Sequence, residues 1–382
     1  MRLAVVGAGA AGLAAAWAAR REGVEVTLVH DRPGATALSS GALDMCEWSA
    51  PDVAREIDAR SLVFATSLGI WQLGTATCSL ATQSGVVRSA RGRDTAILDL
   101  EPLAGRRVAV AALDRGDWDG ETLARVLSSS AWTRRTGTQF MAVHLDWVQS
   151  EEERRMSSYD FARRLSEPKR RASLAKSLAN TACEGWLLGP WLGEEPEVAE
   201  QLREGLHQAV GETTSAPGEV AGARFEKARN RLIEASEIQA IQAQVRRVYS
   251  HAGCWNLDLC SAPGIEVDAV ILALGGVAGG GVQLDHSRLA GGSGSFQLSL
   301  EAPVPLVLNG TPTGEPSSLA GIDFAQHGLG ALERVGAAHR DHAILHQPGL
   351  YVAGDLVAAR PRTILEAVQG GIRAALRALG DR

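Results

Sequence analysis

The sequence predicts an α/β protein with a buried parallel β-sheet and a smaller α+β region inserted into it. Three stretches carry this prediction. Residues 1–30 read as strand, glycine turn, helix and strand. Residues 268–276 form an apolar run that ends in glycines, and residues 349–379 read as a short strand followed by a long helix. Continuous apolar runs are typical of strands that are buried on both faces of a parallel sheet.

The turn after the first predicted strand, 3–6, carries the pattern G-A-G-A-A-G, with Gly7, Gly9 and Gly12 at the G-x-G-x-x-G positions. The first glycine permits the sharp turn out of the strand, the second lets a pyrophosphate approach bare backbone, and the third lets the next helix lie close to the sheet. An alanine-rich buried helix with incidental glycines would not place all three between a strand and a helix. This stretch therefore predicts a Rossmann-type dinucleotide-binding unit.

The second predicted strand, 25–30, ends in His30, where an acidic residue usually binds the adenosine ribose. Asp31 follows one position later, which is the opposite face of a strand. A neutral imidazole can still hydrogen-bond a hydroxyl group. The sequence therefore predicts a pyrophosphate site with His30 in place of the usual ribose-binding acid.

Composition and charge exclude several classes of protein. Hydrophobic residues make up 45% and charged residues 21% of the 382 residues, which are values of a globular protein. The net charge of −6, without a dense basic stretch, argues against nucleic acid as a partner. The five cysteines are scattered without a C-x-x-C pattern, so we expect no iron–sulfur cluster and no metal site in this chain.

Residues 3–19 carry no charge, but glycines interrupt them and they are short for a membrane span. Cleavage of this stretch as a signal peptide would also destroy the glycine pattern. We therefore expect no export signal and no transmembrane helix. The expected location is the cytoplasm, with contact to the inner face of the membrane made indirectly through a partner.

A loop rich in small hydroxyl residues follows the second strand and includes Thr36, Ser39, Ser40 and Gly41. Hydroxyl groups can donate to phosphate oxygens, and glycine permits close approach of a ligand. An ordinary polar loop or helix cap is an equally good interpretation of these residues.

The central part of the chain mixes helices and strands. A strand is expected at 106–113, and a short strand with a turn at 82–88. Helices are expected at about 51–73, 120–130, 150–206 with an interruption at 188–193, and 225–235.

The apolar run 268–276 predicts a further parallel strand with Gly275 in the turn behind it. Ligands of open α/β sheets bind beyond the carboxyl ends of the strands, so Gly275 is a second predicted cofactor contact. Near the C-terminus, Gly354 and Asp355 end another strand. The carboxylate can accept hydrogen bonds from the hydroxyl groups of a sugar alcohol, and the glycine lets a ligand reach it.

The last helix begins with a capping box, Thr363-Ile-Leu-Glu366, and we expect it to run to about residue 379. Its N-terminus carries partial positive charge and could stabilise negative charge on a reduced flavin, so Thr363 is counted with the cofactor site. Gly370 and Gly371 weaken a helix, which indicates close packing against the sheet or a cofactor.

Six blocks, in order, make the chain resemble the B subunit of anaerobic glycerol-3-phosphate dehydrogenase, a family of glutathione-reductase-like flavoproteins. They are L-S-S-G-A-L-D at 38–44, T-Q-S-G-V-V-R at 82–88, the N-T-A-C-E segment within 179–193, T-T-S-A-P-G-E-V-A-G-A-R at 213–224, the strand and glycine run at 270–281, and I-L-E-A-V-Q-G-G-I at 364–372.

The resemblance implies a Rossmann-type FAD-binding domain with an inserted smaller α+β cap or substrate domain. The expected FAD-binding segments are 1–75, 236–285 and 346–382, and the expected cap segments are 76–235 and 286–345. The expected cofactor is FAD, because the turn is of the pyrophosphate type, with FMN kept as the alternative. The residues that the resemblance assigns to the flavin are Gly7, Gly9, Gly12, Ser39, Ser40, Gly41, Gly275, Gly354 and Asp355.

The resemblance also implies an enzyme, an FAD-dependent oxidoreductase that takes electrons from a small hydroxylated or phosphorylated substrate. The electrons would pass through the flavin to a partner or quinone. The implied partners are a catalytic flavoprotein subunit and an iron–sulfur subunit, and whether this chain acts alone is left open. Two alternatives remain: a non-catalytic relay or docking subunit, and a stand-alone FAD oxidase or dehydrogenase of an amine or hydroxy acid.

Catalytic residues are less well defined by the sequence. Arginines beside a flavin can bind a phosphate or carboxylate, and a histidine can act as a base. Each of these side chains also has an ordinary structural or solvent-exposed interpretation. The candidate anion-binding residues are Arg88, Arg224, Arg360 and Arg362, and the candidate bases are His286 and His327.

Overall fold

The computed structural model describes residues 1–45, 57–285, 295–308, 311–312 and 334–381. The chain forms two compact units. The first unit consists of residues 1–36, 56–64 and 229–382, and the second of residues 37–55 and 65–228. Each unit has its own core and is described by itself.

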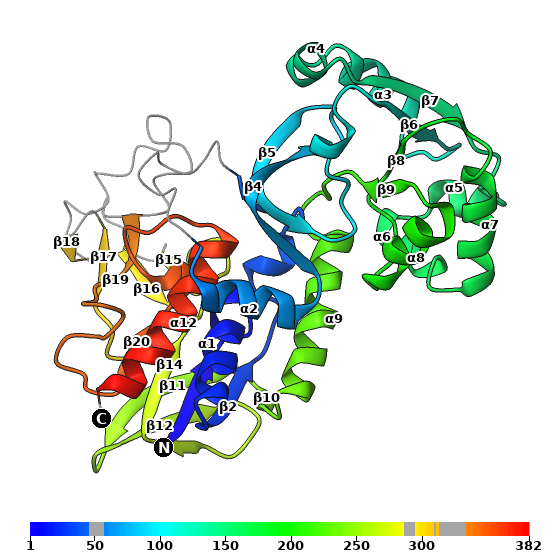
Figure 1. Ribbon diagram of the computed structural model, residues 1–382. Helices are drawn as coiled ribbons and strands as arrows, with labels where there is room; N and C mark the ends of the chain where they lie inside the picture. Colours follow the sequence, from blue (N-terminus) through cyan, green and yellow to red (C-terminus); the bar gives the residue numbers. More distant parts are fainter. Residues whose placement is uncertain (46–56, 286–294, 309–310, 313–333, 382) are drawn as a thin grey trace. The chain divides into compact units, whose positions relative to one another are not determined.

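A five-stranded parallel sheet forms the centre of the first unit, in the order β10-β2-β1-β14-β20 (Figure 1). Because all five strands are parallel, their carboxyl ends lie at one edge. The strands are β1 (Arg2–Val6), β2 (Glu25–His30), β10 (Gln239–Gln242), β14 (Ala269–Leu272) and β20 (Leu350–Val352).

Two helices, α1 (Ala10–Arg21) and α12 (Ile364–Gly380), pack against each other beside this sheet (Figure 1). A Cβ atom on Gly371 would lie 2.1 Å from the carbonyl oxygen of Ala11, so the two backbones approach closely at this point. The last helix thus packs closely at Gly371, but its neighbour there is helix α1 and not the sheet or a cofactor, which the sequence predicted.

We expect Gly371→Val to lower the free energy of unfolding of the first unit by about 1–3 kcal/mol, because an added side chain forces the packed helices apart. Urea denaturation followed by circular dichroism measures this change. Gly380→Ala is the control, since a Cβ atom at Gly380 would meet no atom of the described residues within 4 Å. Equal stability of both variants would contradict the packing described here.

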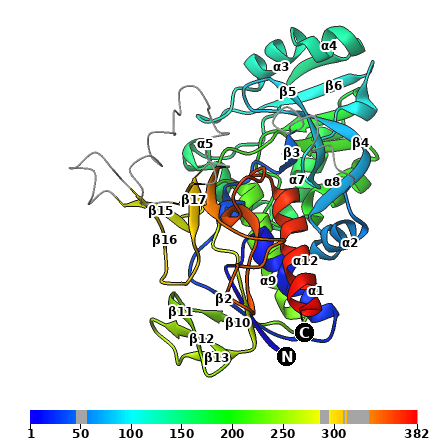
Figure 2. The ribbon, with the colours of Figure 1, turned by 90° about the vertical axis from the view of Figure 1, so that its left-hand side faces the viewer.

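Smaller antiparallel sheets complete the first unit (Figure 2). One joins β11 (Val245–His251), β12 (Cys254–Leu259) and β13 (Ile265–Val267). The others pair β15 (Val282–Asp285) with β16 (Ser295–Leu298), and β17 (Leu306–Leu308) with β18 (Thr311–Pro312) and β19 (Val335–Ala337).

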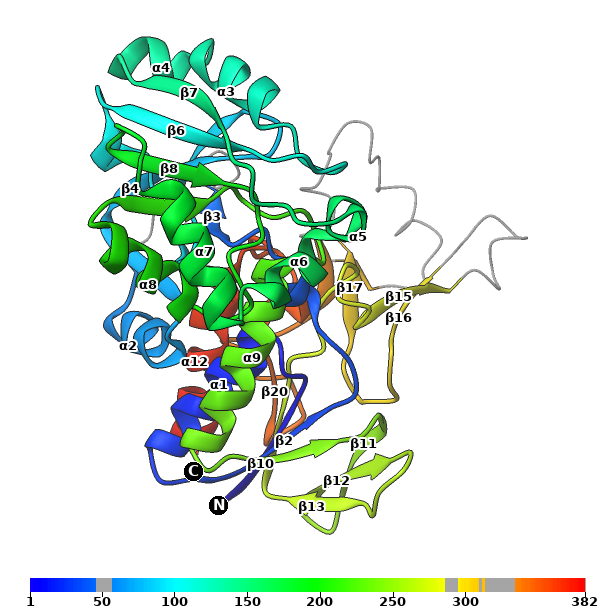
Figure 3. The ribbon, with the colours of Figure 1, turned by 90° about the vertical axis from the view of Figure 1, so that its right-hand side faces the viewer.

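The second unit is built around a four-stranded parallel sheet in the order β7-β6-β8-β9. In Figure 3, α3 and α4 lie on one face of this sheet, and α7 and α8 on the other. Its elements are β6 (Arg107–Ala112), α3 (Gly120–Ser128), α4 (Ala131–Thr136), β7 (Gln139–His144), α5 (Glu151–Arg155), α6 (Ser158–Arg164), α7 (Pro168–Leu178), β8 (Gly185–Leu188), α8 (Glu197–Leu206) and β9 (Ala209–Glu212).

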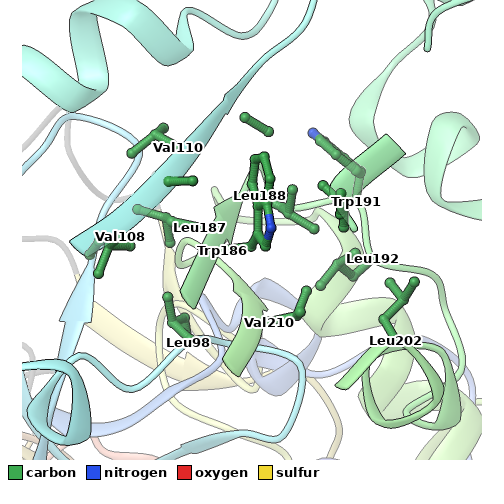
Figure 4. Close-up of a cluster of buried hydrophobic side chains, with 14 of the residues drawn as sticks. Leu98, Val108, Val110, Trp186, Leu187, Leu188, Trp191, Leu192, Leu202 and Val210 are labelled. Carbon is green, nitrogen blue, oxygen red and sulfur yellow. The ribbon is translucent and has the colours of Figure 1, made fainter. Parts of the chain in front are cut away.

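The predicted fold class, α/β with a Rossmann-type domain and an inserted region, is confirmed. The inserted region differs from the expectation in one respect, because it contains a doubly wound parallel sheet of its own. Its core is apolar and includes Trp186 and Trp191, both fully buried (Figure 4). The sequence assigned 150–206 mainly to helices and so missed β8, a strand of four residues whose side chains are all buried.

An antiparallel sheet, β3-β5-β4, also belongs to the second unit. It consists of β3 (Ala42–Met45), β4 (Trp71–Ala81) and β5 (Val87–Asp94). The predicted first FAD segment, 1–75, spans both units, since 37–55 and 65–75 belong to the second. Its assignment to FAD stays a prediction. The helix predicted at 51–73 is reduced, among the described residues, to α2 (Ala59–Leu68).

A further helix and short 3₁₀ turns join these elements in sequence. Helix α9 (Val220–Ala235) leads to β10, and three short 3₁₀ turns are η1 (Ala35–Leu38), η3 (Glu101–Leu103) and η6 (Gly354–Leu356). The loop-rich segment predicted at 286–345 falls in the first unit where it is described, and forms β16 to β19 there.

Candidate cofactor-binding site

The glycine turn connects β1 with α1 at the carboxyl edge of the first sheet. Gly7 has a φ of +106°, and a Cβ atom there would lie 2.3 Å from the carbonyl oxygen of Ala273. A Cβ atom on Gly12 would lie 1.7 Å from the carbonyl oxygen of Gly7. The fold itself therefore requires glycine at both positions.

Gly9 differs from these two glycines. Its backbone is extended, with φ −72° and ψ −175°, which any residue can adopt. Among the described residues beyond its chain neighbours, a Cβ atom there would meet one atom within 4 Å, the Thr36 Oγ1 at 3.4 Å. The open space beside Gly9 is the place at which a pyrophosphate would reach the backbone.

The N-terminus of α1 presents N–H groups at this point. The first N–H groups of a helix have no acceptor within the helix, and they carry partial positive charge. The Ala10 N–H donates to the Thr36 hydroxyl oxygen at 3.0 Å, which leaves the hydroxyl hydrogen able to donate to a phosphate oxygen. The first turn of α1 contains no acidic residue, so nothing there repels an anion.

The loop after β2 meets the loop after β14 at the same edge. The Arg32 guanidinium donates through Nη2 to the Gly280 carbonyl oxygen at 3.0 Å. Gly275 has a φ of +79°, and a Cβ atom on the next residue, Gly276, would lie 2.8 Å from the Asp355 carbonyl oxygen. The turn containing Gly275 therefore packs beside the turn after β20.

That turn contains Gly354, with a φ of +65°, and Asp355 in η6. Helix α12 follows, and its N-cap Thr363 accepts the Glu366 N–H at 3.2 Å, so half of the predicted capping box is present. The structure thus brings Gly7, Gly9, Gly12, Gly275, Gly354, Asp355 and Thr363 into one unit. Their individual contacts with a cofactor stay predictions.

This arrangement fits a dinucleotide that extends from the N-terminus of α1 toward the turn after β20. The comparison with known families agrees. Residues 2–66 match the FAD binding domain family. The match covers β1, the glycine turn, α1 and β2. The match confirms FAD as the cofactor and an FAD-dependent oxidoreductase as the class of enzyme, and it supports the preference for FAD over FMN.

The solved structures that match this chain are distant from it. Glycine oxidase from Geobacillus kaustophilus is 12% identical, covering 98% of this chain and 95% of its own, with a TM-score of 0.38. The GidA-related protein from Thermus thermophilus is 11% identical, covering 100% of this chain and 98% of its own, with a TM-score of 0.36. The comparison with curated proteins found no match.

His30 ends β2, as predicted, and is half-buried. Burial and the neighbouring Arg229 lower the pKa of His30, against the opposing effect of Asp31. The imidazole is therefore neutral at pH 7 and can exchange a hydrogen bond with a hydroxyl group. Its contact with the adenosine ribose stays a prediction.

Ser39, Ser40 and Gly41 belong to the second unit. Thr36, by contrast, is the last residue of the first segment of the first unit. The Ser39 hydroxyl oxygen accepts the Gly41 N–H at 3.0 Å. Gly41 has a φ of +85°, and a Cβ atom there would lie 2.6 Å from Ile97 Cδ1. Packing within the second unit therefore explains Gly41 without a ligand.

Arg224 is fully buried in the second unit, and protein groups occupy its guanidinium. Its Nε donates to Asp94 Oδ2 at 2.9 Å, its Nη2 pairs with Glu212 Oε1, and its Nη1 donates to the Gly193 carbonyl oxygen at 2.8 Å. The structure thus contradicts the predicted role in anion binding, because this guanidinium compensates two buried carboxylates.

The remaining candidates have different surroundings. Arg88 lies half-buried on β5 in the second unit. Arg362 donates to the carbonyl oxygens of Val357 at 2.9 Å and Val335 at 2.7 Å, which holds the segment before α12 in place. His286 and His327 lie outside the described residues.

Aromatic side chains occupy the corresponding edge of the second parallel sheet. Ligands bind doubly wound sheets at the point where the strand order reverses, beyond the carboxyl ends of the central strands. Trp147, in the loop after β7, stacks on Trp191, in the loop after β8, with ring centroids 6.3 Å apart. Phe161 packs edge-on against both rings, so aromatic side chains fill this region.

Within the described residues, no group of three or more His, Cys, Asp or Glu side chains converges to hold a metal ion. In the same part of the chain, no helix is long and apolar enough to cross a membrane.

Sequence reasoning missed one cluster of chemically capable residues, His339 and His342, in the loop between β19 and β20. The two imidazole rings are stacked, with centroids 5.7 Å apart. The spacing H-R-D-H at 339–342, shortly before the strand that ends in Gly354, was the signal that could have identified them.

Proposed function

We propose that this chain is a dehydrogenase subunit that oxidises a small hydroxylated or phosphorylated substrate, such as glycerol 3-phosphate, and passes the electrons to a partner or quinone. The observation that carries the proposal is the single edge of the first sheet, where the glycine turn, the Gly275 turn, Asp355 and the start of α12 come together. The resemblance of the six sequence blocks supports the class of substrate.

The protein contributes binding and electrostatics, while bound FAD supplies the two-electron chemistry. The N–H groups at the start of α1 and the Thr36 hydroxyl bind the pyrophosphate. The Asp355 carboxylate accepts hydrogen bonds from the hydroxyl groups of the ribitol chain. The N-terminus of α12 places partial positive charge at the end of the same edge, where it stabilises negative charge.

The proposal includes partners, a catalytic flavoprotein subunit and an iron–sulfur subunit, as the resemblance implies. The sequence supports this division of labour, because its cysteines lack the spacing of cluster ligands. With such partners the chain would work in the cytoplasm, attached to the inner face of the membrane through them.

A second candidate, a relay or docking subunit without a substrate site, is favoured by one observation. Arg224 and Arg362, two of the arginines predicted to bind substrate, have guanidinium groups bonded to protein oxygens. In this case FAD would pass electrons between partners, or the fold would dock the catalytic subunit.

An anaerobic absorption spectrum of the purified chain distinguishes these functions. We expect flavin bands that bleach when glycerol 3-phosphate is added, because the chain then contains a working dehydrogenase site. Bands that persist with glycerol 3-phosphate and bleach with dithionite would favour the relay subunit. Absence of flavin bands after reconstitution with FAD would overturn the dehydrogenase and the relay subunit and leave the docking role.

A further inference from the structure

The loop between β19 and β20 places two histidines beside the cofactor edge. The His342 Nδ1 lies 3.0 Å from the carbonyl oxygen of Val352, the last residue of β20. A Cβ atom on Gly370 of α12 would lie 3.5 Å from His342 Cε1 and 3.6 Å from the Gly354 nitrogen. The ring of His342 is therefore next to the turn that we assign to the flavin.

Hydrogen bonds determine which nitrogen of each ring carries the proton. A carbonyl oxygen can only accept, so the neutral His342 ring carries its hydrogen on Nδ1 and has a lone pair on Nε2. The His342 backbone N–H donates to His339 Nδ1 at 3.2 Å, so the neutral His339 ring carries its hydrogen on Nε2. The pair thus offers one acceptor and one donor.

Charged groups surround the two rings. Burial lowers the pKa of both histidines, Arg360 lowers it further, and Asp341 opposes the shift. His342 also lowers the pKa of His339, and Arg373 of α12 lowers that of His342. Both rings are therefore neutral at pH 7, which leaves the lone pair on Nε2 of the buried His342 as a proton acceptor.

Arg360 lies between this pair and the start of α12. Its Nη1 is 3.5 Å from the Glu366 carboxylate, in the first turn of the helix, and its side chain is 31% exposed. A partly exposed guanidinium beside a helix N-terminus is suited to bind a phosphate or carboxylate.

The backbone of the same region is strained. Asp341, His342, His346 and Ala359 all have positive φ values between 49° and 67°. Non-glycine residues in this conformation cost of order 1 kcal/mol or more each, and they cluster at functional sites. The rest of the loop thus holds the His342 backbone in a left-handed conformation.

We propose that His342 is the base of the dehydrogenation and that His339 and Arg360 bind the anionic group of the substrate. This inference rests on the proposed function. The substrate C–H hydrogen leaves with its electron pair as a hydride, which reduces the oxidised flavin. The O–H proton passes to Nε2 of His342, and a carbonyl group replaces the alcohol. His339 donates a hydrogen bond from Nε2 to the phosphate or carboxylate, and Arg360 forms an ion pair with the same group.

The test compares His342→Asn with His346→Asn in the FAD-loaded chain. Both positions have positive φ, which asparagine tolerates, and His346 is exposed. We expect His342→Asn to slow bleaching by glycerol 3-phosphate about 100-fold, as for loss of a general base. The fall of the wild-type rate at acid pH should disappear in this variant, while FAD content, melting temperature and dithionite bleaching match those of His346→Asn.

The proposed anion site is tested by a binding measurement, which needs no turnover. In calorimetric titrations with glycerol 3-phosphate, we expect Arg360→Gln to weaken binding about 10-fold or more, as for loss of a charged hydrogen bond. His339→Asn should weaken it less, and His346→Asn should leave it unchanged.

The outcomes separate the inference from the proposed function. Bleaching of His342→Asn at the wild-type rate would overturn the inference and leave the dehydrogenase in place. A wild-type chain that binds the phosphate through Arg360 without bleaching would support the anion site and overturn both the dehydrogenase and the base. A wild-type chain that neither binds nor bleaches would overturn both. If His342→Asn fails to fold, the Arg360→Gln titration tests the anion site. The base is then tested by whether the bleaching rate of the wild-type chain falls at acid pH.

Discussion

FAD is expected to be lost from the chain when Gly9 is replaced by valine, while the fold is retained. The extended backbone of Gly9 accepts any residue, and a Cβ atom there would be 3.4 Å from Thr36 Oγ1. The branched side chain would fill the space in which a pyrophosphate approaches the N–H groups of α1. Loss of these charged hydrogen bonds, about 3 kcal/mol, corresponds to an affinity for FAD that is at least about 100-fold lower.

Absorbance of the purified variant at the flavin bands measures bound FAD, and circular dichroism measures the fold. Gly12→Val is the matched comparison, because its Cβ atom would overlap the Gly7 carbonyl oxygen at 1.7 Å and should disrupt the first unit itself. A Gly9→Val chain that binds FAD as tightly as the wild type would show that the cofactor does not approach α1 at this point.

The ends of the chain could be predicted from the sequence because their signals are local. The glycine pattern, the capping residue Thr363 and the turn residue Gly354 each need neighbours within a few positions. Strands β8 and β9 could not be found in this way. Each has four residues, and both are held by parallel pairing with strands far away in the chain.

The roles of polar side chains were harder to predict for the same reason. Arg224 binds Asp94, which is 130 positions away in the sequence. Gly41 lies in a motif that suggests a ligand, yet its requirement comes from contact with Ile97. His342 becomes a candidate base because its Nδ1 is hydrogen-bonded to the carbonyl oxygen of Val352, and no sequence pattern predicts this contact.

Replacement of Arg224 by methionine is expected to destabilise the second unit by about 3–5 kcal/mol, the usual cost of leaving a buried charge without its partner. Asp94 and Glu212 would both lose their counter-ion in a fully buried site. Arg163→Met is the control, since this arginine is exposed and pairs with Glu194 at 3.8 Å. We expect the control to change stability by less than about 1 kcal/mol. Urea denaturation of both variants measures the difference.

The loss of stability in Arg224→Met should depend on pH because of the buried carboxylates of Asp94 and Glu212. Burial raises the pKa of Glu212, and Arg224 is the group that opposes this effect most strongly. Without Arg224, the folded-state pKa of Glu212 rises further above its unfolded value, so the variant gains stability by binding a proton as the pH falls. The loss of stability relative to the wild type should therefore shrink as the pH falls toward the ordinary carboxyl range, and should be largest at neutral pH.

Binding of glycerol 3-phosphate should not change in the folded Arg224→Met variant, because the Arg224 guanidinium is already bonded to protein groups. If the folded variant lost this binding, Arg224 would again be a candidate substrate-binding residue.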